Sequence, residues 1–589
     1  MKRSMMCGEV RANHAGQTVV LQGWVHSVRD HGGLIFIDLR DRAGIVQVIV
    51  NPASAADAHQ IASDLHDEYV VEIRGQVERR PAGSENPRIA TGEIEVHAQQ
   101  VSVLNPCLPL PFPVAEEAQV DERVRLQYRY IDLRRPRMVR NIELRHKVNK
   151  YIRDFLSAQG FLEIETPIMA NPTPEGARDY LVPSRLHPGC FYALPQSPQQ
   201  FKQLCMVGGL DRYFQIARCF RDEDLRANRA AEFTQLDLEM SFVEQEDVLG
   251  VCEALFTGLT ESLSTKKVLR KPWPRITWQE AMDRYGSDKP DLRYDLPIVD
   301  VSSVVADSSF SVFSGAVGSG GVVRGLRAPG AGSFTRRQID ELTELAKAQG
   351  ARGLAWAVPG PELRSSFGKF LSEGEQSALW QAMGARAGDL VLFVADRVEV
   401  ARASLGALRR DVALRLDLIP PDVMAWAFVV EFPWFEATPD GGLTFMHHPF
   451  TMPFDDDVHL LDTDPLKVRA KAYDMVANGE EFASGSIRVH RADIQSRLFE
   501  LLGYSPERIQ SNFGHMLKAF QYGAPPHGGI APGLDRVVGV LVDEDSIREV
   551  IAFPKNQSVQ DLMMGAPTEV QADQLEDLHI RVVEPVTAS

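Results

Sequence analysis

Hydrophobic and polar residues alternate along the N-terminal part of the chain, as they do in half-buried β-strands. The alternating runs are Thr18–His26, Leu34–Leu39, Ile45–Val50, Tyr69–Val77 and Glu93–Val103. A stretch with helical spacing, Ala55–Leu65, separates the third run from the fourth. This arrangement is the plan of an OB-fold, a barrel that often carries single-stranded nucleic acid. We therefore predict a β-barrel domain over residues 1–105.

The pattern changes further along the chain. Prolines crowd the segment after the barrel and predict a stiff linker, residues 106–122. Helical spacing over Ile142–Gln159 opens a region of mixed helices and strands. Serine and glycine crowd 302–332, and helical segments without suggestive polar residues follow. The predicted boundaries are 123–286 and 423–555 for two parts of one motif-rich domain, 287–422 for an inserted accessory domain, and 556–589 for a C-terminal extension.

The length of 589 residues is too great for one compact core, so several domains are expected. The sequence has no run of about 18 apolar residues, which predicts neither a signal peptide nor a membrane span. The six cysteines are scattered and form no C-x-x-C pair. This pattern predicts reduced, buried thiols in a cytoplasmic protein, without zinc or disulfides.

The net charge of −17 argues, taken alone, against a nucleic-acid partner. Affinity for phosphate depends on a local basic face, however, and arginines gather between Arg74 and Arg88 and again between Arg123 and Arg140. A nucleic-acid surface and an ordinary solvated face both remain open for these clusters.

The stretch Asp211–Phe242, DRYFQIARCFRDEDLRANRAAEFTQLDLEMSF, has two strand patterns on either side of a polar loop, as in a long antiparallel hairpin. In the second strand Gln235, Asp237 and Glu239 face one way, and the apolar residues between them face the other. The pattern indicates a sheet with its core on one side and a site on the other. A salt-bridged surface is the alternative, although the hairpin holds more charges than a solvent face needs.

Asn478-Gly479 is the strongest short hairpin signal, because both residues accept positive φ in a two-residue turn. With this turn Glu481 lies opposite Val476, and Asp474 is its diagonal neighbour, roughly 7 Å away on the same face. Two carboxylates at that separation can share a magnesium ion or its waters. An acidic surface pair is the alternative.

The same register has a consequence for Arg488. An unbroken strand would point Glu481 and Arg488 to opposite faces, because their numbers differ by an odd amount. If both belong to one site, a bulge or break must lie near Ala483–Gly485.

The stretch Tyr522–Leu541, YGAPPHGGIAPGLDRVVGVL, contains glycines that let the backbone approach a ligand or another strand closely. Gly533–Leu541 is predicted as a helix with Arg536 in its first turn, where the free N–H groups also favour anions. It matches neither the P-loop nor a G-x-G-x-x-G fingerprint. A phosphate site and a plain tight helix entry both remain open.

Together these segments resemble the class II aminoacyl-tRNA synthetases. The three signature motifs correspond, in order, to Phe161–Pro167 (FLEIETP), Phe220–Glu223 (FRDE) and Gly533–Arg536 (GLDR). Further segments make the chain similar to aspartyl-tRNA synthetases of the bacterial type: Thr173–Asp179, Gln196–Lys202, Tyr285–Asp291 and Met446–Pro449. The resemblance covers nearly the whole chain. It implies a multidomain fold with an N-terminal OB-fold β-barrel, an α+β class II synthetase catalytic domain on an antiparallel sheet, and an inserted α/β domain.

The resemblance implies activation of L-aspartate by ATP with release of pyrophosphate, in which positioning and charge neutralisation dominate. Arg221 would hold the α-phosphate and Arg536 the γ-phosphate of a bent ATP, and both would act in catalysis. Phe233 would stack on adenine, and Glu223 and Glu481 would help to place ATP.

The resemblance also implies a magnesium site at Asp474 and Glu481, bridging the phosphates. The residues implied around aspartate are Glu175, Ser197, Gln199, Lys202, Asp237, His447, His448 and Arg488. Arg488 and Lys202 would meet the side-chain carboxylate, and the neutral amide of asparagine would leave these charges unpaired. The two histidines would approach a substrate carboxylate, where a protonated ring could couple to binding.

For the barrel, the resemblance implies that it reads splayed anticodon bases of tRNA(Asp). The implied tRNA-binding residues are Arg29, His31, Phe36, Gln47 and Glu95, with Phe36 as a stacking platform. Core packing is the alternative for Phe36, which lies in mid-strand. His31 resembles the residue of members that also charge tRNA(Asn), so both scopes stay open. The motif 1 element implies a homodimer.

Two departures from the family pattern bear on the site. Ala483-Ser484 stand where glycines are common and reshape one wall of the pocket. The motif 2 loop reads Asn228-Arg229-Ala230-Ala231, which leaves its contacts to the acceptor end open. A synthetase-like ligase that acts without tRNA is the rival function, but such paralogues usually lack an anticodon domain.

Overall fold

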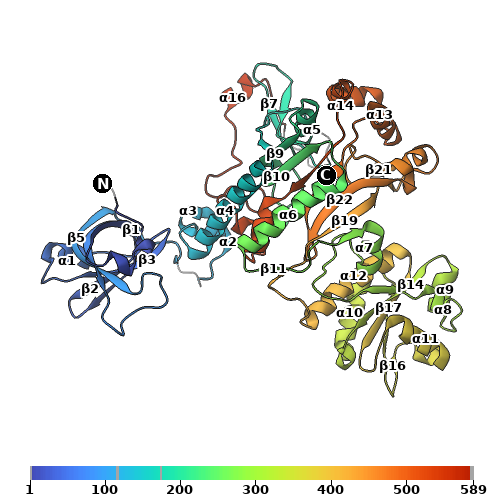
Figure 1. Ribbon diagram of the computed structural model, residues 1–589, viewed down its shortest axis with the longest axis horizontal. Helices are drawn as coiled ribbons and strands as arrows, with labels where there is room; N and C mark the ends of the chain where they lie inside the picture. The colour runs from blue at the N-terminus through green and yellow to red at the C-terminus, as the bar shows by residue number, and fades with distance from the viewer. Residues whose placement is uncertain (1–2, 115–117, 173–175, 584–589) are drawn as a thin grey trace. The chain divides into compact units, whose positions relative to one another are not determined.

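The computed structural model describes residues 3–114, 118–172 and 176–583. The chain forms two compact units, one extending to Arg140 and including Asp561–Met564, the other comprising Asn141–Gln560 and the residues from Gly565 on. Figure 1 shows their elements coloured along the chain. Within the part of the chain that is described, no helix has the length and apolar character needed to cross a bilayer.

The first unit contains a closed five-stranded barrel in the order β1-β2-β3-β5-β4. Its strands are β1 (Thr18–His31), β2 (Leu34–Asp41), β3 (Gly44–Val50), β4 (Val70–Arg79) and β5 (Ile94–Asn105), with α1 (Ala56–Ser63) between β3 and β4. Alternate side chains such as Leu21, Ile37 and Val48 are fully buried inside it. The predicted OB-fold is confirmed.

The second unit is built on an eight-stranded sheet in the order β12-β19-β22-β23-β24-β10-β9-β6. Its strands are β12 (Arg275–Thr277), β19 (Ala427–Pro433), β22 (Arg469–Ala477), β23 (Glu480–Ile487), β24 (His527–Pro532), β10 (Glu232–Ser241), β9 (Arg212–Phe220) and β6 (Leu162–Glu163). Only the outermost pairs, β12–β19 and β6–β9, are parallel. The predicted antiparallel sheet and the β9–β10 hairpin are therefore confirmed.

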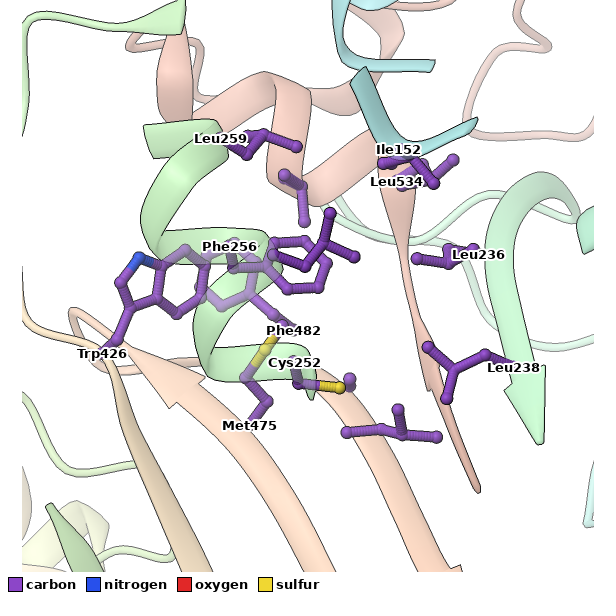
Figure 2. Close-up of a cluster of buried hydrophobic side chains, with 14 of the residues drawn as sticks. Ile152, Leu236, Leu238, Cys252, Phe256, Leu259, Trp426, Met475, Phe482 and Leu534 are labelled. Atoms are coloured by element: carbon purple, nitrogen blue, oxygen red, sulfur yellow. The ribbon is translucent and has the colours of Figure 1, made fainter. Parts of the chain in front are cut away.

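One face of this sheet is covered by α4 (Pro136–Ala158), α6 (Gln245–Leu263) and α15 (Leu534–Leu541). Figure 2 shows Leu236 and Leu238 of β10 pointing into the same cluster as Phe256 of α6 and Leu534 of α15. Because β10 alternates, Gln235, Asp237 and Glu239 point to the opposite face, which holds the site.

A five-stranded antiparallel sheet, in the order β13-β14-β17-β15-β16, forms the inserted region. Its strands are β13 (Ile298–Asp300), β14 (Val322–Ala328), β15 (Ala355–Val358), β16 (Arg364–Ser365) and β17 (Leu390–Asp396). Its helices are α8 (Ser302–Val305), α9 (Ser311–Gly318), α10 (Arg336–Ala348), α11 (Glu373–Met383) and α12 (Val398–Arg415). The region precedes the return of the chain to β19 and joins β12 through α7 (Trp278–Tyr285).

The remaining helices and strands are short or peripheral. The helices are α2 (Glu122–Gln127), α3 (Arg129–Asp132), α5 (Gln199–Val207), α13 (Ala492–Leu501), α14 (Pro506–Phe520) and α16 (Ala572–Asp577). The strands pair in twos: β7 (Leu181–Pro183) with β8 (Phe191–Ala193), β11 (Lys267–Val268) with β18 (Val423–Met424), and β20 (Phe435–Ala437) with β21 (Leu443–Phe445).

The cysteines depart from the prediction that all are buried. Cys7, Cys219 and Cys252 are buried, but Cys190 is exposed and the other two are half-buried. Cys190 belongs to the connection between β7 and β8, which adds no core of its own, so the prediction is wrong at this position.

Candidate active site

A cavity of about 950 Å³ opens on the polar face of the eight-stranded sheet. Most of the predicted site residues line it: Ser197, Gln199, Arg221, Glu223, Phe233, Asp237, His447, His448, Asp474, Glu481, Arg488 and Arg536. Lys202 lies directly behind Asp237. Glu175 falls outside the described residues. Side chains from segments far apart in the sequence thus share one cavity, because β10, β22, β23, β24 and α15 meet along one part of the sheet.

One end of the cavity is a buried network of paired charges. Arg488 donates from Nε and Nη2 to the two carboxylate oxygens of Glu239, at 3.0 and 3.3 Å, and from Nη1 to Ser486 Oγ at 2.7 Å. Lys202 Nζ lies 2.8 Å from Asp237 Oδ1 and 3.2 Å from Glu239 Oε2. All four charged side chains are at most 5% exposed. This end therefore holds two cations and two carboxylates in fixed positions.

Hydrogen-bonding capacity remains within that network. Lys202 and Asp237 are close enough for an ion pair, and among the described residues neither Lys202 Nζ nor either Asp237 oxygen has a partner that meets the geometry of a hydrogen bond. Burial raises the pKa of Asp237 despite the nearby cation. Burial also opposes ionisation of Glu239, but Arg488 and Lys202 outweigh it and lower its pKa. Such capacity in a buried site is what a zwitterionic ligand can use.

Close backbone approach makes room for this network. Gly529 of β24 pairs with Glu239 of β10. A Cβ at Gly529 would lie 2.0 Å from Glu239 Oε2 and 2.1 Å from the carbonyl oxygen of Leu238. Glycine is required there because any side chain would collide with the carboxylate that holds Arg488.

The predicted hairpin turn and bulge both occur. Asn478 and Gly479 have φ values of 54° and 86°. Glu481 pairs with Val476, but Ala483 pairs with Met475, so Phe482 is the extra residue of β23. The predicted bulge near Ala483–Gly485 is confirmed; it lies at Phe482, directly before Ala483. Phe482 enters the apolar core against Trp426, 5.0 Å between ring centroids.

The other end of the cavity carries half-buried cations with fewer constraints. Arg536 donates to the backbone oxygens of Glu481 at 2.8 Å and Asn228 at 3.2 Å. Arg221 lies over the ring of Phe233, 5.0 Å from its centroid. Glu223 faces Arg229 of the polar loop at 3.6 Å. These cations are held by carbonyls and an aromatic face, which leaves their charges available to an anion.

The first turn of α15 is fixed by the residue next to Arg536. Asp535 accepts a hydrogen bond from the backbone N–H of Thr234 at 2.9 Å and another from Arg145 at 2.5 Å. The N–H of Gly533 donates to the carbonyl of Phe482 at 2.8 Å. Helix α15 is therefore tied to both β10 and the bulge of β23, and these contacts set the direction of Arg536.

Asp474 and Glu481 form a pair of carboxylates in the lining of the cavity. Burial and then the charge of Glu481 raise the pKa of Asp474 well above its usual value. Burial also works against ionisation of Glu481, but the ammonium of Lys289, 2.8 Å away, lowers its pKa. Asp474 Oδ1 is buried and has no hydrogen-bond partner among the described residues. The pair therefore has capacity for one more positive charge.

The two histidines of the cavity are buried, and their burial affects their pKa values. Removal from water lowers the pKa of His447 to about 4 and that of His448 well below its usual value; Arg488, Lys202 and Arg221 lower the latter further. Both rings are therefore neutral in the protein without ligands, and the uptake of a proton together with a substrate carboxylate stays a prediction. The Phe450 N–H donates to His448 Nδ1 at 3.3 Å, so the hydrogen of the neutral ring sits on Nε2, which is covered and unpartnered among the described residues.

Sequence reasoning missed three residues of the site. Glu239 was assigned to the correct face but given no role, although it anchors both Arg488 and Lys202. Lys289 lies in a family-like segment and reaches Glu481. Ser484, one of the departures from glycine, contacts His447 Nδ1 at 3.1 Å. The acidic alternation of β10 could have indicated Glu239; no local pattern indicated Lys289 or Ser484.

The loop that carries Lys289 is held by the inserted region. Arg409 of α12 donates to the carbonyl oxygens of Asp291 (2.7 Å), Tyr294 (3.0 Å) and Leu296 (2.9 Å). It is 3% exposed. The inserted region thereby fixes a loop that reaches the main cavity.

The predicted surface residues of the barrel lie on neighbouring strands. Arg29 of β1 pairs with Phe36 of β2, and His31 packs edge-on against Phe36 at 5.7 Å between ring centroids. Gln47 lies on β3, two strands from Arg29. Phe36 is half-buried and stands outside the barrel core, so the core-packing alternative is wrong. Glu95 of β5 is buried and contacts His97 Nε2 at 3.1 Å.

The fold and cavity correspond to a known class of protein. Residues 121–557 match the model of class II tRNA synthetases (D, K and N), and residues 19–104 match the OB-fold nucleic-acid-binding domain. The chain belongs to the class II tRNA synthetase family, which consists of ligases.

Two relatives that match over nearly the full length carry the same name. The chain is 54% identical over 584 residues to the aspartate–tRNA(Asp/Asn) ligase of Moorella thermoacetica, covering 99% of this chain and 97% of the relative. It is 54% identical over 585 residues to the ligase of the same name from Rubrobacter xylanophilus, with the same coverage. Among solved structures, asparaginyl-tRNA synthetase from Pyrococcus horikoshii has a TM-score of 0.58 at 20% identity, covering 94% of this chain and 98% of that one, which supports the fold alone.

Proposed function

We propose that the protein is an aspartate–tRNA ligase. A carboxylate oxygen of the α-carboxyl group of L-aspartate attacks the α-phosphorus of ATP, the bond to the β-phosphate breaks, and pyrophosphate leaves with the electron pair. A hydroxyl of the 3′-terminal nucleotide of tRNA then attacks the carbonyl carbon of aspartyl-adenylate, loses its proton and displaces AMP. The observation that carries this proposal is the convergence of Arg221, Arg488 and Arg536 on one cavity.

The buried end of the cavity suits aspartate. Arg488 and Lys202 offer a planar fork and a compact charge to the side-chain carboxylate. Asparagine would present a neutral amide where aspartate presents a carboxylate, and so would lose the ion pairs to both cations inside a buried site, a cost that supports rejection by a large factor. Asp237, Gln199 and Ser197 suit the α-amino group, and Glu175 is assigned there by family resemblance. The Nε2–H of His448 is a neutral donor for a carboxylate oxygen.

The half-buried end suits the nucleotide. Arg221 holds the α-phosphate and offsets charge as it develops on the phosphorus, while Arg536 holds the γ-phosphate. Phe233 stacks on adenine, on the ring that Arg221 covers in the protein without ligands. Glu223 assists in placing ATP. Because these groups are only half-buried, they can adjust to a triphosphate that changes shape during the reaction.

Asp474 and Glu481 are proposed to hold Mg²⁺ together with phosphate oxygens. Magnesium in nucleotide sites is usually bound by one or two carboxylates together with substrate phosphates. The unpartnered oxygen of Asp474 supports this assignment. When bound, the ion supplies neutralisation of phosphate charge.

The barrel is proposed to bind the anticodon, with Phe36 as a stacking platform beside Arg29, His31, Gln47 and Glu95. The names of the relatives favour a second candidate function, charging of tRNA(Asn) in addition to tRNA(Asp). His31 is exposed at the tip of the β1–β2 hairpin and can reach a base. Charging purified tRNA(Asp) and tRNA(Asn) separately decides between them; charging of tRNA(Asp) alone would exclude the wider scope.

A cytoplasmic homodimer is proposed through the motif 1 element. Leu162 of that segment, and Ile168 and Met169 directly after it, are 48%, 49% and 59% exposed, and such apolar surface is typical of an interface. Light scattering at micromolar concentration should give twice the chain mass, and a monomer at that concentration would contradict the assignment.

The decisive experiment is aspartate-dependent exchange of pyrophosphate into ATP. Exchange is expected with L-aspartate and Mg²⁺, and at least about 10⁴-fold less with asparagine. Absence of exchange would contradict the proposed aspartate–tRNA ligase activity. Exchange without charging of any tRNA would instead favour a synthetase-like ligase that acts on another acceptor, although the barrel supports tRNA as the partner.

A further inference from the structure

A chain of buried hydrogen bonds runs from the backbone to the amino-acid end of the cavity. His527 Nδ1 lies 2.8 Å from the carbonyl oxygen of Pro525. His527 Nε2 lies 3.1 Å from Gln203 Nε2, and Gln199 Nε2 donates to Gln203 Oε1 at 3.0 Å. His527 and Gln203 are fully buried, and Gln199 is 6% exposed and lines the cavity.

The direction of every bond in this chain follows from its first member. A carbonyl oxygen can only accept, so His527 Nδ1 must carry a hydrogen. In the neutral ring Nε2 is then an acceptor, and Gln203 must present its NH₂ group to it. The oxygen of Gln203 therefore faces Gln199, which must turn its own NH₂ group inward. The carbonyl oxygen of Gln199 is left for the cavity.

The neutral ring is supported by its surroundings. Burial lowers the pKa of His527; Arg488 and His490 act in the same direction, while Glu239 and the bond to Pro525 oppose them. A protonated ring would reverse the polarity of the chain, because Nε2 would then donate to Gln203.

Helix geometry brings the two glutamines together. Gln199 and Gln203 are one turn apart on α5 and share a face. Among the hydrogen bonds of the described residues, the link from His527 to the Gln199 amide runs through Gln203. Without this chain the Gln199 amide could present either its oxygen or its NH₂ group, and only the oxygen suits an ammonium group.

We infer that Gln203 and His527 are positioning residues that fix the Gln199 amide with its oxygen toward the cavity, and so select a ligand that carries an α-ammonium group. This inference rests on the proposed function, since it assumes that the amino end of aspartate lies against Gln199. Gln203 and His527 act through Gln199 and touch no substrate atom.

A double-mutant cycle tests the inference. Gln203→Met removes both polar groups with little change in volume and should raise the KM for aspartate about fivefold to tenfold, with the KM for ATP unchanged. Gln199→Met should raise the aspartate KM at least as much. If Gln203 acts only through Gln199, the double variant should match Gln199→Met within about twofold. Multiplicative effects, or no effect of Gln199→Met, would overturn the inference.

Two further variants keep the test interpretable. Gln203→Glu retains an acceptor for Gln199 and should stay closer to wild type than Gln203→Met; an equal loss in both would contradict the assigned polarity. Gln200→Met makes the same chemical change at a neighbouring buried position of α5 outside the cavity lining, and should leave the aspartate KM unaltered. If wild type itself shows no aspartate-dependent exchange, the proposed function fails, whereas normal wild-type exchange with a multiplicative cycle counts against the hydrogen-bond chain alone.

Discussion

Each end of the cavity contains an arginine, but the two arginines differ in burial and in the groups that hold them. Arg488 is 5% exposed and bound by three hydrogen bonds to Glu239 and Ser486. Arg536, at the other end, is half-buried and bound only to backbone oxygens in the contacts described above. A fixed guanidinium in a closed site recognises one small ligand by shape and charge, whereas a looser one accommodates a flexible triphosphate.

The two ends of the cavity should also differ in how strongly a substitution changes the free energy of unfolding. At the amino-acid end each cation has a carboxylate partner, and removal of one partner leaves a buried charge alone, which costs several kcal/mol. At the nucleotide end the charges retain contact with water, so removal of one costs little in folding. Substitutions at the two ends should therefore separate effects on the fold from effects on substrate.

The largest effect is expected for Arg488→Met. The aspartate kcat/KM should fall at least about 10³-fold, and the free energy of unfolding should drop by about 3 kcal/mol, because Glu239 loses its main partner. Urea unfolding and pyrophosphate exchange measure the two quantities. Adding Glu239→Gln should recover most of the stability and none of the activity; recovery of activity would contradict the role of Arg488 in binding.

Arg536→Met should reduce the use of ATP with little effect on the fold, and so should show most clearly that the two ends of the cavity bind different substrates. The ATP kcat/KM should fall about 10²- to 10³-fold through loss of a phosphate contact. The free energy of unfolding should change by less than about 1 kcal/mol, since the side chain is half-buried. Initial rates at varied ATP and varied aspartate provide the comparison. A fall in the affinity for aspartate as large as the fall in the affinity for ATP would contradict the claim that the two ends of the cavity bind different substrates.

His447 should make stability depend on pH. Its pKa is about 4 in the fold, below the ordinary value of 6.5, so the unfolded chain binds a proton first as pH falls. Stability is lost between about pH 6.5 and 4, and His447→Asn should reduce that loss by up to about 1 kcal/mol per pH unit. Urea unfolding at pH 7.5 and pH 5 measures the slope, with the exposed His459→Asn as control. Identical slopes in both variants would contradict the assignment.

Lys289→Met should have the smallest effect. The ammonium pairs with Glu481 at 2.8 Å and so competes with a divalent ion for that carboxylate. Its removal should lower the Mg²⁺ concentration for half-maximal exchange about twofold to fivefold. Lys267→Met, at an exposed ion pair with Asp422, is the matched control. A rise in the Mg²⁺ requirement would mean that Lys289 itself binds phosphate.

Local sequence patterns predicted which side chains share a face of a strand and where a hairpin turns. Alternation assigned Asp237 and Glu239 to one face of β10, and the Asn478-Gly479 turn set the register of β23. The bulge was expected near Ala483–Gly485, and it lies next to that segment at Phe482, whose ring joins the apolar core.

Contacts between distant segments could not be predicted in this way. Glu239 and Arg488 are 249 positions apart, and no periodicity shows that β24 brings them together. Lys289 reaches the cavity from a loop whose path depends on Arg409 in the inserted region. The lowered pKa values of His447 and His448 could not be predicted from the sequence either, because the burial of both rings depends on the assembled fold.

The most direct test of the two-ended cavity is a crystal structure with a non-hydrolysable aspartyl-adenylate analogue. The side-chain carboxylate should lie within about 3 Å of both Lys202 Nζ and the Arg488 guanidinium, with adenine on Phe233 and the phosphate mimic at Arg221. Density that places the aspartyl side chain away from Lys202 and Arg488, or the adenine away from Phe233, would contradict the account.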